Sequence, residues 1–276
     1  MPGGFCVSGG VSIDGETRLK LAEVARKQIV YRIPGMDDVP VRRDIVYKTT
    51  ADGALLMDLY YPAPATPGTR VPLVVIVLGY PDPQSGIRMF GPVTSWARLI
   101  AASGMAAAIY GSSAPADDVH AVMRHLRENA GSLGIDERRI GLYAASANVP
   151  VALTLLMRDA DFTCAAFVCG YTFDFEGSTA CVEASTQYGF VNATAGRSID
   201  ELPATVPLMV VRAGVDQFPG VNAALDRLAT TALARDLPLT FVNHAKAAHG
   251  FYMDDDSDPT RRIIRQVLAF LRLHLA

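Results

Sequence analysis

The chain has 276 residues, of which 50% are hydrophobic and 19% charged, and its formal net charge is -3. This balance is typical of a globular protein and excludes the strongly basic surface on which nucleic acids bind. The longest apolar runs, at 73–78 and 105–110, are far shorter than the about 20 residues that cross a bilayer, so we expect no membrane partner. The first residues show neither the basic nor the apolar segment of a secretory signal, which favours a cytoplasmic location.

The cysteines give no sign of a metal or a disulfide framework. The four residues are Cys6, Cys164, Cys169 and Cys181, and no two of them form a C-x-x-C pair. Cys164 and Cys169 lie in one apolar run at odd spacing, so they would point to opposite faces of a strand and could not bridge each other. We therefore expect free thiols, no metal site and no cofactor.

The N-terminal part of the chain divides into an extension and a hairpin. Residues 1–40 carry a predicted helix over 17–27 and would serve either as a packing arm or as a contact in a homo-oligomer. Two extended segments between 41 and 61 flank Asp52 and Gly53, a pair typical of a tight hairpin turn. The sheet is therefore expected to begin with antiparallel strands.

From residue 73 onward, apolar runs and helical patterns alternate. We predict strands over 73–78, 105–110, 139–143, 162–169, 207–212 and 239–243, and helices over 93–103, 117–130, 149–157, 219–234 and from Asp258 to the C-terminus. This alternation is the pattern of a parallel sheet with crossover helices. The sequence thus predicts one α/β domain over 41–276, a mostly parallel sheet with an antiparallel N-terminal hairpin and helices on both faces.

The last helix has good start chemistry, with Asp258 as its N-cap and Pro259 at its first helical position. This gives the aspartate-rich run before it a structural explanation, and we expect no metal there.

One connection is too long for a plain loop. Residues 170–205 separate two predicted strands and are rich in aromatic side chains. We interpret them as a cap or lid over a site, which would exclude bulky groups; the alternative is an extra helix packed on the sheet edge. The aromatic residues of this segment are Tyr171, Phe173, Phe175, Tyr188 and Phe190.

Ser146 lies at a strand-to-helix turn, the context that a nucleophile elbow requires. There the serine backbone would be strained toward positive φ. The usual G-x-S-x-G has Ala144 and Asn148 in place of its glycines, so a serine at an ordinary helix N-terminus is the alternative. Because Asn148 is larger than glycine, we expect either a slightly displaced helix or an Asn148 side chain that turns aside and hydrogen-bonds a neighbouring loop.

Two further strand ends carry residues suited to acyl transfer. Asp216 follows the strand at 207–212, and His249 lies in a loop after the strand at 239–243. With Ser146 they give the chain order Ser, Asp, His that is typical of α/β-hydrolases. The rival base is His244, which ends its strand, and the rival acid is Asp174, which lies within the predicted cap.

These residues carry a resemblance to the α/β-hydrolase superfamily, specifically to its esterase and dienelactone-hydrolase-like branch. It covers roughly residue 41 to the C-terminus and rests on LVVIVLGYP, LRENAGSLGIDERRIGLYAASA, RAGVDQFPG and AAHGF. The chain departs from the pattern at the two elbow glycines and at Leu78, where many relatives carry histidine. Serine also replaces the cysteine nucleophile of dienelactone hydrolases.

Acyl-transfer chemistry assigns a role to each residue. His249 would remove the Ser146 proton, and Asp216 would fix the imidazole tautomer. The N–H groups of Ala147, at a helix N-terminus, and of Tyr80, which precedes a proline, would hold the oxyanion. We further expect substrate contacts from Gly79, Tyr171, Phe218 and Phe251.

The sequence therefore predicts a serine carboxylesterase that cleaves small esters through an acyl-enzyme. A peptidase or lactonase would share the same three residues and differ in pocket shape. A ligand-binding protein without catalysis is the alternative from a different class, motivated by the altered elbow.

Overall fold

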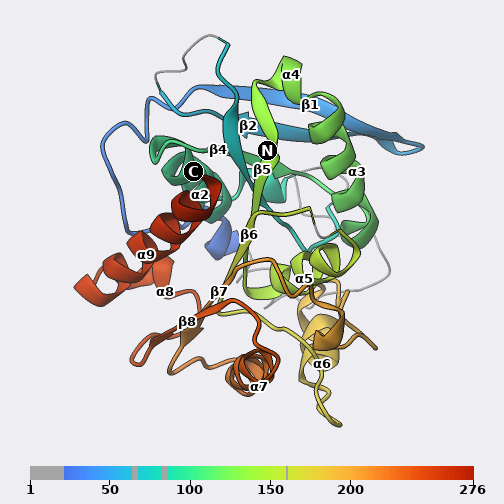
Figure 1. The fold of residues 1–276 in the computed structure, drawn as a ribbon, viewed down its shortest axis with the longest axis vertical. Coiled ribbons are helices and arrows are strands. Elements are labelled where there is room, and N and C mark those ends of the chain that lie inside the picture. The colour runs from blue at the N-terminus through green and yellow to red at the C-terminus, as the bar shows by residue number, and fades with distance from the viewer. Residues whose placement is uncertain (1–21, 64–67, 83–85, 160) are drawn as a thin grey trace.

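A computed structural model of the chain describes residues 22–63, 68–82, 86–159 and 161–276. Its described residues form one eight-stranded sheet in the order β1-β2-β4-β3-β5-β6-β7-β8 (Figure 1). The strands are β1 (Val41–Thr50), β2 (Gly53–Tyr60), β3 (Val71–Ile76), β4 (Ala106–Tyr110), β5 (Ile135–Ala145), β6 (Cys164–Val168), β7 (Leu208–Ala213) and β8 (Leu239–His244). β1, β2 and β4 pair antiparallel, and all the other pairs are parallel. The predicted sheet is thus confirmed.

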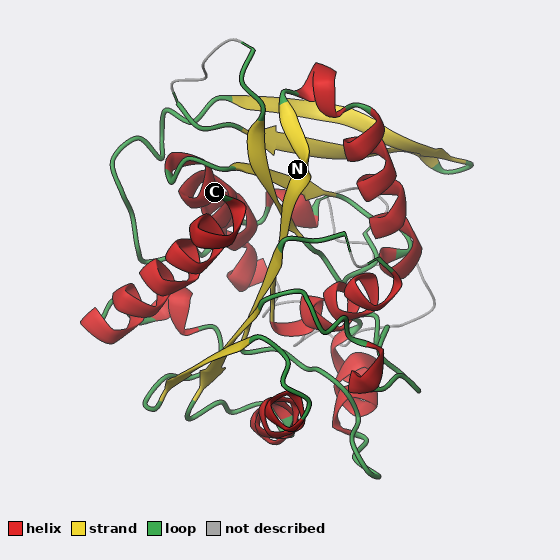
Figure 2. Ribbon diagram, in the orientation of Figure 1, coloured by secondary structure: helices red, strands yellow, loops and turns green. Residues whose placement is uncertain are grey.

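The helices cover both faces of this sheet. They are α2 (Gly91–Ala102), α3 (Pro115–Glu128), α4 (Ala130–Leu133), α5 (Val149–Arg158), α6 (Ala180–Tyr188), α7 (Val221–Ala234), α8 (Phe251–Asp254) and α9 (Asp258–Leu275), with 3-10 turns η1 (Ile87–Met89), η2 (Ser146–Asn148) and η3 (Ile199–Glu201). Figure 2 shows α2 and α9 on one side of the sheet and α3 and α5 on the other. No helix in the described ranges is long and apolar enough to cross a bilayer.

The central strands read as apolar runs because both of their faces are covered. Every residue of β4 and β6 is buried, as are the last four residues of β3. Alternation of polar and apolar residues is therefore absent from the middle of the sheet. Covered faces leave the carboxyl ends of the strands as the open edge, where loops can carry functional side chains.

The start of the last helix differs from the prediction by one residue. Ser257, not Asp258, is the N-cap of α9, and its side chain accepts the Thr260 N–H at 3.4 Å. Asp258 is instead the first helical residue, where its charge favours the positive end of the helix dipole. The aspartates just before it have partners: Asp255 bonds Ser257 and Thr260.

The N-terminal segment packs against the rest of the chain. Of the helix predicted over 17–27, residues 22–26 are helical and residue 27 is not. Residues 17–21 of that prediction, and Cys6, lie outside the described residues. Ile29, Met36 and Val39 are buried in the core. The Ile29 N–H donates to Ser95 Oγ of α2 at 3.1 Å, which fixes this segment against the first face helix.

Residues 170–205 combine a short helix with buried aromatic side chains. α6 occupies the middle of the segment, and Tyr171, Phe173 and Phe190 are buried. Tyr171 and Phe190 stack with ring centroids 5.6 Å apart. The Val191 N–H donates to the Gly79 carbonyl at 2.9 Å, so this segment contacts the loop after β3.

Candidate active site

Ser146 lies at the sharp turn between β5 and α5, with a φ of 58°. Residues other than glycine rarely adopt a left-handed backbone, and such strain clusters at functional sites. Ala145 before it is extended, and Val149 after it is helical. The positive φ expected of an elbow is therefore present without either elbow glycine.

The structure brings the three predicted side chains into one hydrogen-bonded chain. Ser146 Oγ lies 2.6 Å from His249 Nε2, and His249 Nδ1 lies 2.7 Å from Asp216 Oδ2. The side chain of Asp216 is fully buried and that of His249 is 10% exposed. One imidazole thus contacts the serine through one nitrogen and the carboxylate through the other.

The loops that carry Asp216 and His249 are bound to each other. The Val215 N–H donates to Ala247 O at 2.9 Å, and the His249 N–H donates to Gln217 Oε1 at 3.0 Å. Asp216 Oδ1 accepts the Phe218 N–H at 2.9 Å, which fixes the rotation of the carboxylate. The acid and the imidazole are therefore held by backbone contacts as well as by their own hydrogen bond.

Both rival residues are engaged elsewhere. His244 Nε2 lies 2.9 Å from Thr260 Oγ1 and 3.4 Å from Asp255 Oδ2, at the start of α9. Asp174 accepts the N–H groups of Cys181 and Val182 at 2.8 and 3.2 Å, at the start of α6. Each of these rivals therefore binds the start of a helix rather than Ser146 or His249.

Asn148 connects the elbow to the loop after β3. Its Oδ1 accepts the Gly79 N–H at 2.7 Å, and its Nδ2 donates to Ala145 O at 3.0 Å. The prediction that this side chain hydrogen-bonds a neighbouring loop is confirmed. Gly79 must lack a side chain, because a Cβ there would lie 2.6 Å from Ala147 O.

Two residues beside Ser146 carry backbone N–H groups that no helix or strand hydrogen bond of the described residues uses. Ala147 is among the first residues of a helical turn, whose N–H groups have no acceptor within the helix. Tyr80 follows Gly79, and its N–H has no hydrogen-bond partner among the described residues. Both residues line the same cavity as Ser146.

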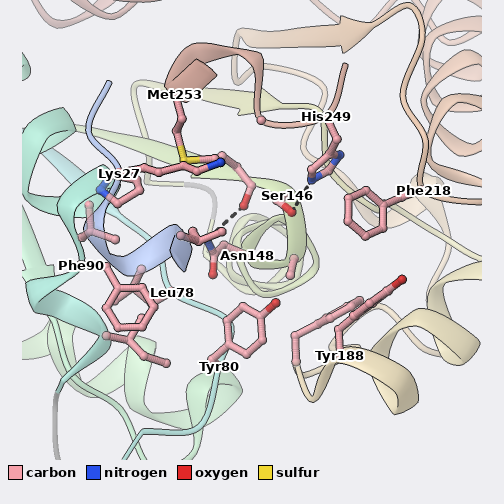
Figure 3. Close-up of a pocket in the computed structure, with 18 of the residues that line it drawn as sticks. Lys27, Leu78, Tyr80, Phe90, Ser146, Asn148, Tyr188, Phe218, His249 and Met253 are labelled. Atoms are coloured by element: carbon pink, nitrogen blue, oxygen red, sulfur yellow. Dashed lines mark hydrogen bonds between the residues drawn. The ribbon is translucent and has the colours of Figure 1, made fainter. Parts of the chain in front are cut away.

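This cavity has a volume of about 420 Å³ and is lined mainly by apolar side chains. Figure 3 shows His249, Phe218 and Tyr188 on one side of Ser146, and Leu78, Phe90 and Lys27 on the other. The residues that line it include Val24, Lys27, Leu78, Tyr80, Ile87, Phe90, Val93, Ser146, Ala147, Asn148, Tyr171, Tyr188, Phe190, Gln217, Phe218, His249, Tyr252 and Met253.

Two expected substrate contacts do not line the cavity. Phe251 is 3% exposed and packs its ring against His244, with centroids 5.2 Å apart. In the short helix α8 successive side chains point in different directions, so Tyr252 and Met253 reach the cavity instead. Gly79 does not line the cavity and donates its N–H to Asn148 Oδ1.

The N-terminal segment supplies part of the cavity wall, which the sequence did not reveal. Lys27 Nζ donates to Asp254 Oδ2 at 2.9 Å, and this hydrogen bond is the main cause that raises the Lys27 pKa above its usual value. The Val30 N–H donates to Tyr252 O at 2.9 Å. Gly91 approaches Lys27 so closely that a Cβ would lie 2.0 Å from its carbonyl oxygen.

The described cysteines are free and buried. Burial raises the pKa of the Cys164, Cys169 and Cys181 thiols to about 12, so none is a ready nucleophile. Among the described residues, no group of three or more His, Cys, Asp or Glu side chains could hold a metal ion.

Comparison with known proteins reveals structural neighbours but no sequence relatives. No protein-family model matches the chain, and no curated protein matches it either. A bacterial heroin esterase superposes with a TM-score of 0.69 at 14% identity, covering 96% of this chain and 98% of its own. Carboxyl esterase 2 of the fungus Tuber melanosporum gives 0.68 at 15% identity, covering 96% and 100%. A thermophilic esterase of the planctomycete Thermogutta terrifontis gives 0.65 at 20% identity, covering 91% and 96%.

These similarities establish the fold class. The protein has the α/β-hydrolase fold, with an eight-stranded mixed sheet, an antiparallel N-terminal hairpin and covering helices. Its neighbours of that fold are esterases. At sequence identities this low, the structural similarity shows a shared fold and not a shared activity.

Proposed function

We propose that the protein is a serine hydrolase that cleaves small carboxylic esters through an acyl-enzyme. The observation that carries this proposal is the chain of hydrogen bonds from Ser146 through His249 to Asp216, mounted on a strained turn beside an apolar cavity. A fold shared with esterases supports it. The dienelactone-hydrolase-like branch of the superfamily remains our assignment from the sequence.

In the proposed acylation step, His249 Nε2 takes the proton of Ser146 Oγ as the oxygen attacks the ester carbonyl. Asp216 keeps the other imidazole proton on Nδ1 and stabilises the imidazolium that forms. The N–H groups of Ala147 and Tyr80 stabilise the negative oxygen of the tetrahedral intermediate. When that intermediate collapses, the alcohol oxygen leaves with the proton from Nε2, and the acyl group stays on Ser146.

Deacylation repeats these steps with water as the nucleophile. His249 removes a proton from water, the resulting oxygen attacks the acyl carbonyl, and the released Ser146 oxygen recovers the proton from Nε2. The products are a carboxylic acid and a regenerated serine. Each step uses groups of this chain and water.

Three further assignments accompany this proposal. We assign the hydrolase domain to 41–276, with 1–40 as an extension and about 170–205 as a cap that contributes Tyr171 and Tyr188 to the cavity. A cytoplasmic location is supported by the free state of the three described cysteines. The small volume of the cavity favours a small-molecule ester over a polypeptide.

The test is covalent labelling together with turnover. A fluorophosphonate should react with the folded protein at Ser146 and abolish hydrolysis of p-nitrophenyl butyrate, while the Ser146→Ala protein should neither react nor turn over. A folded protein that resists labelling and hydrolyses no ester across acyl lengths from acetyl to dodecanoyl would instead support a binding protein. Preference for a lactone or an amide over all these esters would shift the assignment to a lactonase or peptidase.

A further inference from the structure

The side of the cavity next to His249 is aromatic. The Phe218 ring lies edge-on to the imidazole, with ring centroids 4.5 Å apart, and Tyr188 lies edge-on to Phe218 at 5.3 Å. Both rings line the cavity. They are supplied by different parts of the chain, Phe218 by the loop after β7 and Tyr188 by the end of α6.

The reaction fixes which part of an ester meets these rings. His249 Nε2 must lie within hydrogen-bond distance of the leaving alcohol oxygen in order to protonate it. The alcohol group therefore begins beside the imidazole and extends along the Phe218 ring. The acyl group would then extend toward the opposite side of Ser146, where Figure 3 shows Leu78, Phe90 and Lys27.

We propose that this protein prefers esters whose alcohol portion carries an aromatic ring, held by Phe218 and Tyr188. The inference rests on the proposed ester hydrolysis and names the substrate class of that site. Edge-to-face ring pairs at 4.5–7 Å add attraction beyond the burial of apolar area. One additional ring–ring contact between substrate and protein corresponds to about a two- to ten-fold higher kcat/KM for an ester with an aromatic ring than for one with a saturated ring.

Benzyl butyrate and cyclohexylmethyl butyrate test this directly. Their leaving alcohols are similar in size, and the cyclohexyl ring is the more apolar, so burial alone would favour the saturated ester. Benzyl alcohol is slightly the more acidic, and a comparison between variants controls for that difference. The wild-type protein should give a two- to ten-fold higher kcat/KM for the benzyl ester. A ratio at or below one would overturn the proposal.

Two variants test whether Tyr188 is responsible for the preference for the benzyl ester. In Tyr188→Leu the benzyl to cyclohexylmethyl ratio should fall toward one. Tyr188 contacts Phe218 rather than the imidazole, so the change leaves the His249 hydrogen bonds in place. The matched control is Tyr61→Leu, because Tyr61 is also half-buried but bonds Leu133 O outside the cavity, and it should keep the wild-type ratio. An unchanged ratio in Tyr188→Leu would contradict the assigned contact.

Measuring ester binding without turnover distinguishes failure of this inference from failure of the proposed function. Calorimetric titration of the Ser146→Ala protein with the two esters should give tighter binding of the benzyl ester. If that preference exists while the wild-type protein hydrolyses neither ester, hydrolysis is refuted and the aromatic subsite stands. If both esters are hydrolysed and bound equally well, the subsite is refuted and hydrolysis stands.

A second inference concerns the loop after β3, whose peptide groups are held from both sides. Asn148 Oδ1 accepts the Gly79 N–H, and the Val191 N–H donates to the Gly79 carbonyl at 2.9 Å. The N–H of a trans peptide points opposite to its carbonyl, so fixing the Gly79 carbonyl also fixes the direction of the Tyr80 N–H. The Asn148 side chain is itself held by its hydrogen bond to Ala145 O, so it fixes the position of this loop relative to the elbow.

We infer that Asn148 is a positioning residue that aligns the Tyr80 N–H with the oxyanion, in a position where an elbow usually has glycine. Removing one oxyanion donor from a serine hydrolase lowers kcat about 10²–10³-fold, and misaligning it should cost part of that. Asn148→Ala should therefore lower kcat about 10- to 100-fold with little change in KM. Asn129→Ala is the control, since Asn129 also donates to a main-chain carbonyl, that of His125, but does not line the cavity.

A trifluoromethyl ketone with a butyl chain distinguishes alignment from general disruption, because it forms an oxyanion on Ser146. Its affinity should fall in Asn148→Ala by the same factor as kcat per fluorophosphonate-titrated site. Wild-type kcat in this variant, or a loss of kcat without a parallel loss of ketone affinity, would overturn the inference.

Discussion

Replacement of Asp216 by asparagine probes the orientation of His249. Asp216 Oδ1 accepts the Phe218 N–H at 2.9 Å, and Oδ2 accepts from His249 Nδ1 at 2.7 Å. An asparagine must keep its oxygen toward the Phe218 N–H, because its amide nitrogen has no lone pair to offer there. The NH₂ group then faces Nδ1, which forces the ring proton onto Nε2 and leaves Ser146 without a base.

The expected loss follows from that tautomer. The same exchange in serine proteases lowers kcat about 10⁴-fold, and each factor of ten is 1.36 kcal/mol of activation free energy. We therefore expect Asp216→Asn to raise the barrier by about 5 kcal/mol. Because asparagine has nearly the shape of aspartate, the fold should survive, with an unchanged circular dichroism spectrum as the check.

Asp174→Asn provides the comparison. Asp174 binds two N–H groups at the start of α6, so its exchange should lower kcat no more than about ten-fold. Both variants would be assayed with p-nitrophenyl butyrate over a range of pH. Near-normal activity in Asp216→Asn together with a large loss in Asp174→Asn would refute the assignment of the acid.

Three further predictions follow from burial and charge. Burial raises the pKa of Cys164, Cys169 and Cys181 to about 12. In a Cys6→Ser protein, Ellman's reagent at pH 8 should therefore react with these thiols only after unfolding. Rapid reaction in the native state would contradict this. Burial raises the Asp118 pKa, but hydrogen bonds from Lys48, Ala114 and Ser112 outweigh it and hold that pKa below its usual 3.8. The carboxylate therefore stabilises the fold above pH 3.8 and loses this effect as pH falls through the lowered value. Asp118→Asn should reduce the free energy of unfolding by about 2–3 kcal/mol at pH 7 and progressively less in acid, as denaturant titrations would measure. Finally, a cavity of about 420 Å³ should give a higher kcat/KM for p-nitrophenyl butyrate than for p-nitrophenyl dodecanoate. A higher kcat/KM for the dodecanoate would contradict a cavity closed to long acyl chains.

The parts of the molecule that the sequence predicts well depend on local patterns. Apolar runs identify the buried strands, and the residues just after them must meet at one edge of a parallel sheet. Ser146, Asp216 and His249 can therefore be grouped from the sequence alone. The size of Asn148 leaves two outcomes open, a displaced helix or a side chain that hydrogen-bonds a neighbouring loop, and the structure shows the second.

The parts that the sequence misses depend on contacts between distant segments or on a shift of one residue. Nothing near Lys27 indicates that it will meet Asp254, so the sequence does not predict the N-terminal wall of the cavity. The orientation of a four-residue helix cannot be derived from sequence, so the sequence predicts Phe251 in the cavity, whereas the structure places Tyr252 there. A serine next to an aspartate made the start of α9 ambiguous by one position.

The measurement that tests the central claim most directly is capture of the acyl-enzyme. The protein would be mixed rapidly with p-nitrophenyl butyrate, quenched in acid, digested and mapped by mass spectrometry. Our account predicts a butyryl group on Ser146 that forms within a single turnover and disappears as substrate is exhausted. Hydrolysis that proceeds without this adduct, and persists in Ser146→Ala, would contradict it.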